Sequence, residues 1–166
     1  KERRIENAVK AVREMAKIAE MYGVVLADEP VNRFESETIN TVEEELGFLD
    51  RVDSPWVKTV VDTFHMNIEE DDLISAILYA GKRIAHVHLA ENNRKLPGNG
   101  HLDWRSILKA LNDIGYTSYL TMESFQIPYA AISDSMCIWR DLCTVDIDED
   151  VKNAVAYLKG IMNDIS

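Results

Sequence analysis

Four side chains of metal-binding type stand at the ends of four short apolar runs. They are Glu29 after residues 24–28, Asp62 after 56–61, His88 after 84–87 and Glu123 after 119–122. Their separations are 33, 26 and 35 residues, and a strand with its return helix takes roughly 30 residues or more. Parallel strands bring their carboxyl ends to one rim, where (β/α) barrels keep their active sites. Three carboxylates and one imidazole that converge there predict a divalent-cation site.

The segments between these runs have the apolar spacing of amphipathic helices. Helices are expected over 3–22, from 42 to the break at 54–55, and over 70–80, 104–114, 133–142 and 148–163; strands are expected over 24–29, 56–62, 84–88 and 118–123. The order α(βα)₄ predicts an α/β fold with a parallel sheet. A complete TIM (β/α)₈ barrel takes about 250 residues, so residues 1–166 are expected to form a single partial barrel domain, the C-terminal (βα)₄ half.

The start of the chain agrees with a partial barrel. Lys1 leads straight into the first expected helix, with no strand before it. We therefore expect the N-terminal half of the barrel to be missing. An open parallel sheet exposes two edges, and exposed edges favour pairing with another chain, so a homo-oligomer is also expected.

Strand alternation assigns the four side chains to one face of the sheet. Successive side chains of a strand point to opposite faces. One face therefore carries Ala27, Glu29, Val60, Asp62, His86, His88, Thr121 and Glu123, and the other carries Leu26, Val61, Val87 and Met122. The second face is apolar and is expected to be covered by helices.

Composition excludes several classes of partner. The 166 residues are 46% hydrophobic and carry a formal charge of −11, which disfavours nucleic acid and anionic membranes, because both are bound through basic patches. No stretch approaches the roughly 18 apolar residues of a membrane span. Cys137 and Cys143 are too few and too close for a disulfide framework; we interpret them as buried small side chains in a cytoplasmic protein.

The chemistry of the four side chains limits which cations the site would bind. Oxygen ligands with one imidazole suit Mg²⁺, Mn²⁺ or Co²⁺ better than a structural zinc site, which prefers Cys and His. Such an ion could bind two neighbouring oxygens of a sugar and stabilise an enediolate at the chelated carbonyl. Carboxylates above and below the sugar could then remove and return a proton on carbon.

Several motifs resemble a known family. They are Glu29-x-x-Asn32-Arg33-Phe34-Glu35, Asp62-Thr63-Phe64-His65-Met66-Asn67, His86-x-His88-x-x-Glu91-x-Asn93-Arg94, Pro97-Gly98-x-Gly100 and Met122-Glu123. In this order, and over nearly the whole chain, they resemble the D-tagatose/D-psicose 3-epimerases, which are xylose-isomerase-like barrels. Ser124 and the sequence Asp28-Glu29-Pro30 depart from the family pattern.

The resemblance implies a metal-dependent ketose 3-epimerase. It implies that Glu29, Asp62, His88 and Glu123 bind the cation, with Mn²⁺ favoured and Mg²⁺ or Co²⁺ as alternatives. By the same resemblance, Glu29 and Glu123 form the acid/base pair on opposite faces of C3. Glu35, His65 and Arg94 match the residues that hold the oxygens of the ketose substrate.

Two alternatives stay open at this point. Related barrels share a similar cation site, so aldose–ketose isomerisation or inosose dehydration would use the same residues. The chain could also be a non-catalytic, metal-binding half-barrel that self-associates through its open sheet.

Overall fold

Four short parallel strands form one sheet in the computed structural model, which describes residues 1–127, 131–143 and 145–165. The strands are β1 (Leu26–Asp28), β2 (Val57–Asp62), β3 (Ile84–Leu89) and β4 (Leu120–Met122). Their order in the sheet is β1-β2-β3-β4, the order of the chain. The predicted α/β fold with four parallel strands is confirmed.

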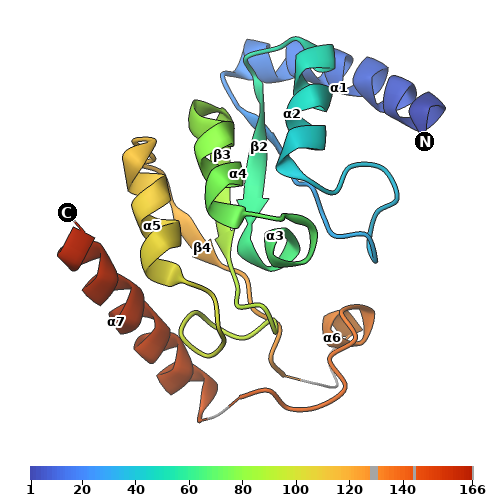
Figure 1. Ribbon diagram of the computed structural model, residues 1–166. Helices are drawn as coiled ribbons and strands as arrows, with labels where there is room; N and C mark the ends of the chain where they lie inside the picture. Colours follow the sequence, from blue (N-terminus) through green and yellow to red (C-terminus); the bar gives the residue numbers. More distant parts are fainter. Residues whose placement is uncertain (128–130, 144, 166) are drawn as a thin grey trace.

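Helices connect the strands and form an outer layer. The longer ones are α1 (Glu2–Tyr22), α2 (Val42–Val52), α4 (Leu73–Ala80), α5 (Trp104–Asp113) and α7 (Ile147–Ile165), and the short ones are α3 (Thr63–Glu69), the 3₁₀ turn η1 (Gly81–Arg83) and α6 (Ala131–Ser135). Helices α2, α4 and α5 lie side by side across the strands, with α1 packed on α2 and α7 on α5 (Figure 1). No helix in the described residues is long and apolar enough to cross a membrane.

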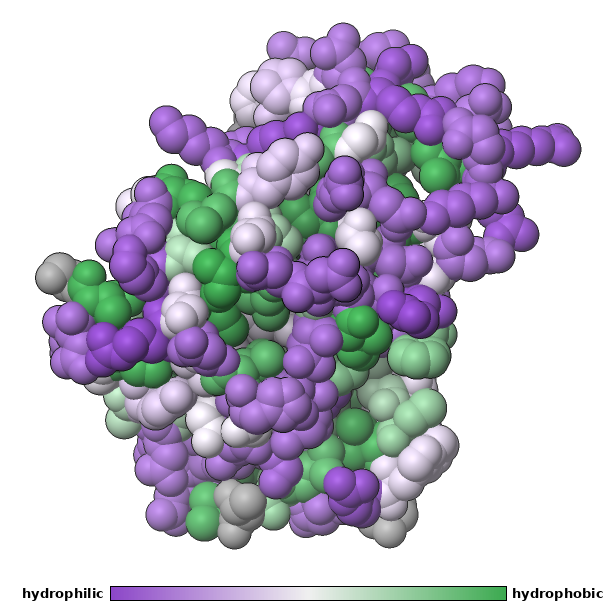
Figure 2. All heavy atoms as spheres, viewed as in Figure 1, coloured by the Kyte–Doolittle hydropathy of each residue, from purple (hydrophilic) through white to green (hydrophobic). Residues whose placement is uncertain are grey.

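The hydrophobic core lies between the strands and this helical layer. Val61 and Val87, from the face predicted to be apolar, are each 1% exposed, and Leu26 and Met122 pack partly buried against the same core. On the outer surface of the helical layer, hydrophobic residues are interspersed with hydrophilic ones (Figure 2). On the opposite face of the sheet, Ala27 and Thr121 are exposed. The alternation predicted from sequence therefore separates a packed face from an open one.

The structure differs from expectation in two helices. Helix α3 was not predicted; it begins directly after β2 because the Asp62 carboxylate caps it, accepting from the backbone N–H groups of Phe64 and His65. The helix expected over 133–142 ends at Ser135, because Cys137 takes a left-handed conformation with φ of 58°. Cys137 is also exposed and Cys143 only partly buried, so the interpretation of both as buried side chains is wrong.

A carboxyl group is buried on the core side of α2. Glu45 is 0% exposed, and neither of its side-chain oxygens has a hydrogen-bond partner within the described ranges. Burial raises the pKa of Glu45 to about 9, and the nearby Asp28 carboxyl adds to that rise. Glu45 is therefore a neutral carboxylic acid in the folded chain at neutral pH.

The first prediction concerns Glu45→Gln. Unfolded Glu45 loses its proton near the ordinary glutamate pKa of 4.5, whereas the folded residue keeps it up to about 9. Between these values the wild-type free energy of unfolding falls with rising pH because of this group, by at most about 1.4 kcal/mol per pH unit. The stability gained by Glu45→Gln should therefore grow with pH in urea unfolding at pH 5, 7 and 8.5.

Glu43→Gln is the matched control, since Glu43 is an exposed acid on the same helix. Its stability relative to wild type should stay nearly constant over this pH range. A pH-independent effect of Glu45→Gln would contradict the buried neutral state.

Candidate metal centre

The four predicted strand-end groups come together in the structure. Glu29, Asp62, His88 and Glu123 each offer one ligand atom, and these atoms all lie within 4.8 Å of one another. His88 is central: its Nδ1 lies 3.0 Å from Oε1 of Glu29, 3.3 Å from Oε2 of Glu123 and 3.8 Å from Oδ2 of Asp62. The parallel register explains this meeting, because Asp62 pairs directly with His88 across β2 and β3.

The two carboxylate oxygens of Asp62 have different surroundings: one caps helix α3, and the other faces the cluster. Oδ1 accepts from the backbone N–H groups of Phe64 and His65 at 2.7 and 3.1 Å. Oδ2 is buried and has no hydrogen-bond partner among the described residues. A buried acceptor without a donor is costly, and a cation beside Oδ2 would satisfy it.

The charged groups of this cluster shift one another's pKa values. Hydrogen bonds that His88 donates to the carboxylates of Glu123 and Glu29 raise the pKa of His88 to about 10. The same bond to His88 lowers the pKa of Glu123 to about 2. Burial raises the pKa of Asp62 to about 7, against the opposing charge of Arg94. These shifts favour a protonated imidazole on His88 beside an ionised Glu123.

The three side chains predicted to hold substrate form a second group beside the first. Nη2 of Arg94 lies 3.6 Å from Oε1 of Glu35 and 3.4 Å from Nε2 of His65. Nη1 of Arg94 lies 3.8 Å from both Oδ2 of Asp62 and Oε2 of Glu123. Nη1 is buried and has no hydrogen-bond partner among the described residues. The two groups therefore share one polar space, and their roles toward substrate stay predictions.

Aromatic rings and backbone hydrogen bonds hold Arg94 in place. Its guanidinium carbon lies 3.8 Å from the ring centre of Phe64 and 5.2 Å from that of Phe125, a geometry in which a cation is attracted to the ring face. Arg94 has φ of 64°, a left-handed conformation uncommon outside glycine. The backbone N–H of Arg94 donates to the carbonyl of Glu91, and its carbonyl accepts from Phe125 N–H.

The loop that carries Arg94 is clamped by Glu91, whose role the sequence did not indicate. Glu91 is 1% exposed, and its carboxylate accepts from Trp104 Nε1 at 2.5 Å and from Gly98 N at 2.8 Å. Leu102 N donates to its other oxygen at 3.2 Å. A Cβ at Gly100 would collide with that oxygen, so glycine is required there. The only signal in the sequence was the position of Glu91 inside a motif.

The donor set fits a hard divalent cation. Three carboxylates and one imidazole are ligands that Mn²⁺ and Mg²⁺ accept, and Glu29 and Glu123 have side chains 27% and 34% exposed, so bound ligands could reach them. The unsatisfied Oδ2 of Asp62 supports the same conclusion.

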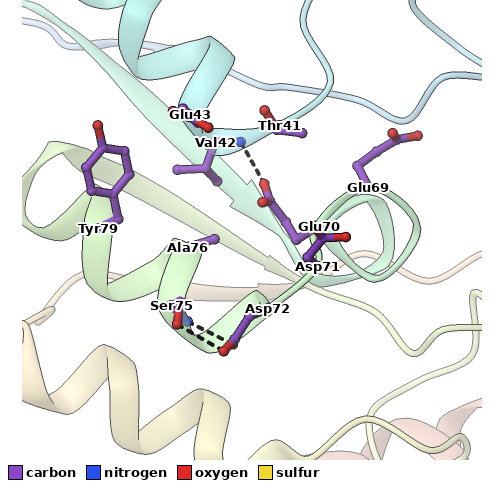
Figure 3. Close-up of a pocket in the computed structure, with 10 residues that line it drawn as sticks. All are labelled: Thr41, Val42, Glu43, Glu69, Glu70, Asp71, Asp72, Ser75, Ala76 and Tyr79. Atoms are coloured by element: carbon purple, nitrogen blue, oxygen red, sulfur yellow. Dashed lines mark hydrogen bonds between the residues drawn. The ribbon is translucent and has the colours of Figure 1, made fainter.

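A separate acidic pocket does not belong to this centre. It has a volume of about 430 Å³ and lies between the start of α2 and helices α3 and α4 (Figure 3). Two of its acids cap helices: Glu70 accepts from Val42 N at 2.7 Å and Asp72 from Ser75 N at 3.0 Å. Asp72 is thus the N-cap of α4.

Comparison with known proteins defines the class. The family model described as a xylose isomerase-like TIM barrel matches residues 1–158, so the chain belongs to this family. D-psicose 3-epimerases of Enterocloster bolteae and Ruminiclostridium cellulolyticum are 42% and 45% identical over 159 and 137 residues. A crystal structure of D-psicose 3-epimerase with D-tagatose from Clostridium cellulolyticum H10 superposes with a TM-score of 0.90 at 40% identity. The resemblance found in the motifs is confirmed.

The match covers part of each relative. It includes 93% of this chain and 53% of the Enterocloster protein, 82% and 47% for the Ruminiclostridium protein, and 95% and 56% for the crystal structure. The chain thus spans about half the length of the curated relatives it matches, and it corresponds to their C-terminal portion.

The second prediction concerns cation binding. A cation takes neutral imidazole, so it must displace the proton that His88 holds up to about pH 10. The affinity for Mn²⁺ should therefore rise with pH between 6 and 8, with proton release. Calorimetric titration in buffers of different ionisation enthalpy measures both quantities.

Glu43→Gln serves again as the control and should bind Mn²⁺ like the wild type, whereas His88→Ala should lose most of the affinity. Binding that is independent of pH and releases no proton would contradict this account of the cluster.

Proposed function

We propose that this chain carries the catalytic half of a metal-dependent ketose 3-epimerase. The observation that carries the proposal is the meeting of Glu29, Asp62, His88 and Glu123 within 4.8 Å, in a chain about 40% identical to D-psicose 3-epimerases. In this proposal all four side chains hold the cation. Mn²⁺ is the favoured ion, with Mg²⁺ and Co²⁺ as alternatives.

Two of these carboxylates are also proposed to move the proton. When bound, the cation supplies Lewis-acid polarisation of the C2 carbonyl of the ketose. One carboxylate, Glu29 or Glu123, removes the C3 proton, and the C–H electron pair becomes the C2–C3 double bond of an enediolate. The other carboxylate returns a proton to the opposite face of C3, which re-forms the carbonyl and inverts the centre. Oxygens of both carboxylates lie close to His88 Nδ1, at 3.0 and 3.3 Å, which supports placing both beside one bound sugar.

Glu35, His65 and Arg94 are proposed to hold the sugar oxygens. The guanidinium and the imidazole supply donors, and the Glu35 carboxylate supplies an acceptor. Arg94 is 5% exposed and His65 is 3% exposed, so hydrogen bonds to a bound sugar would form away from bulk water. Fixed donors and acceptors of this kind orient C3 between the two carboxylates.

Completion of the barrel is part of the same proposal. We treat residues 1–166 as a single partial barrel domain whose open sheet is closed by another half. Strands β1 and β4 are the edge strands of the sheet, and the flanking Val24 and Tyr119 are 51% and 82% exposed. Those edges also support the alternative of an inert half-barrel that self-associates. Sedimentation combined with a turnover assay distinguishes the two cases, because the alternative requires an oligomer without turnover.

The third prediction is epimerisation by the full natural chain that contains this sequence. With Mn²⁺, it should interconvert C3 epimers among D-fructose, D-psicose and D-tagatose, and products formed in D₂O should carry deuterium at C3. Removal of the cation by chelation should abolish turnover, and added Mn²⁺ should restore it. A panel of aldoses and inososes tests isomerisation and dehydration in the same assay.

Variants then assign the roles. Glu123→Gln should lower kcat by about 10² to 10⁴-fold, the usual contribution of a general acid or base, and any activity that remains should exchange the C3 proton of one epimer without inversion. Glu43→Gln is the control and should keep wild-type kcat. A protein with measured bound metal and no turnover of any ketose would overturn the proposal.

A further inference from the structure

Asn32 lies in the loop after β1, between Glu29 and Glu35, and its amide has one defined orientation. The residue is 2% exposed. Its Oδ1 accepts from the backbone N–H of Phe34 at 2.9 Å. A backbone N–H can only donate, so the atom facing it is the amide oxygen, and the amide nitrogen must point the other way.

The amide nitrogen points at His65. Nδ2 of Asn32 lies 2.8 Å from Nδ1 of His65 and 2.9 Å from Oε1 of Glu35. The backbone N–H of Asn32 donates to the same Nδ1 at 3.2 Å. Two donors therefore meet one ring nitrogen, so Nδ1 of His65 must be an acceptor without a hydrogen. A neutral imidazole with a bare Nδ1 carries its hydrogen on Nε2.

The other ring nitrogen faces the polar space beside the metal centre. Nε2 of His65 lies 3.4 Å from Nη2 of Arg94. An arginine nitrogen is a donor only, so it cannot accept the hydrogen on Nε2. The two donors on Nδ1, at 2.8 and 3.2 Å, are shorter contacts than the 3.4 Å from Arg94 to Nε2, so they decide the tautomer. Nη2 of Arg94 and Nε2–H of His65 then lie side by side at the polar space, where one oxygen with two lone pairs can accept from both.

We propose that Asn32 is a positioning residue that fixes His65 in the Nε2–H tautomer and thereby makes His65 a hydrogen-bond donor to an oxygen of the bound ketose. The identity of the ligand rests on the proposed function. The amide also restrains the Glu35 carboxylate, since one Nδ2 group bridges His65 and Glu35. In this proposal Asn32 makes His65 a donor and restrains the Glu35 acceptor. His65 and Glu35 contact the sugar, and Asn32 does not.

The tautomer is directly measurable by ¹⁵N NMR of the histidine rings. The protein is loaded with Mg²⁺, because Mn²⁺ would broaden the signals. We expect a bare Nδ1 and a protonated Nε2 for His65, assigned by comparison with His65→Gln. A hydrogen on Nδ1 in the wild type would overturn the inference without any variant of Asn32.

The decisive variant is Asn32→Asp, which keeps the shape and replaces the donor by an acceptor. The His65 Nδ1 signal should move to the protonated position. In ketose turnover the main effect should be on KM, which should rise about tenfold or more, with a smaller change in kcat. The reason is that the lost interaction binds a sugar oxygen that is remote from the reacting carbon C3. An unchanged Nδ1 signal in Asn32→Asp would also overturn the inference.

Asn40→Asp is the matched control in the same loop. The Asn40 amide donates to the carbonyls of Val31 and Ser36 at 2.7 and 3.0 Å, and it has no hydrogen bond to His65. This variant should lower stability and leave the His65 signals in place. If Asn40→Asp shifts them as Asn32→Asp does, loop order rather than the Asn32 amide sets the tautomer, and the inference fails.

Failure of this inference is separable from failure of the proposed function. An Nε2–H ring in a protein that turns over no ketose would count against the function alone. A protonated Nδ1 in an active epimerase would count against the role of Asn32 alone.

Discussion

The site depends on one constraint: the ends of the parallel strands hold three carboxylates close together at one rim. These carboxylates repel one another and therefore require a positive charge among them. Each arrives from a different strand end, and strand pairing leaves them no freedom to separate. Nδ1 of His88 lies 3.0 Å from an oxygen of Glu29 and 3.3 Å from an oxygen of Glu123, and a proton on this imidazole compensates part of their charge. A divalent cation would compensate more of it. The arrangement is therefore one in which fold stability and cation affinity are coupled through the same few atoms.

The surrounding contacts keep these atoms in place. Thr63 Oγ1 donates to the carbonyl of Ala90 at 2.6 Å and accepts from its N–H at 2.9 Å, which ties the end of β2 to the end of β3. One oxygen of Asp62 is committed to capping α3, so only the other faces the cluster. Glu91, three residues past His88, anchors the loop that returns Arg94 to the same space. A second layer of buried hydrogen bonds thus orients the groups of the first.

How much of this was predictable depends on whether the signal is local in sequence. The four strand-end groups follow from strand alternation and βα spacing, and both are readable along the chain. Helix α3 was missed because its cap, Asp62, was already interpreted as the end of a strand. Glu45 sits among acids on α2 and resembles a solvated residue; its burial depends on packing against the sheet. The functions of Glu91 and Asn32 depend on hydrogen bonds with residues distant in the sequence: Glu91 accepts from Trp104, and Asn32 donates to His65. No periodicity encodes such contacts.

This half of the barrel fixes the positions of the site residues but not their exposure to water, because one face of its sheet is open. The four proposed cation ligands and the three side chains proposed to hold the sugar come from the strand ends, α3 and the loops of this sheet, so their relative positions are set within this half. Their dielectric surroundings are not: Ala27 and Thr121 on the same face are exposed, and the Glu35 side chain is 36% exposed. Proton transfer at carbon gains most from fixed dipoles in a site from which water is excluded. Cation binding should therefore need only the four strands, whereas rapid epimerisation should also need whatever closes the inner face.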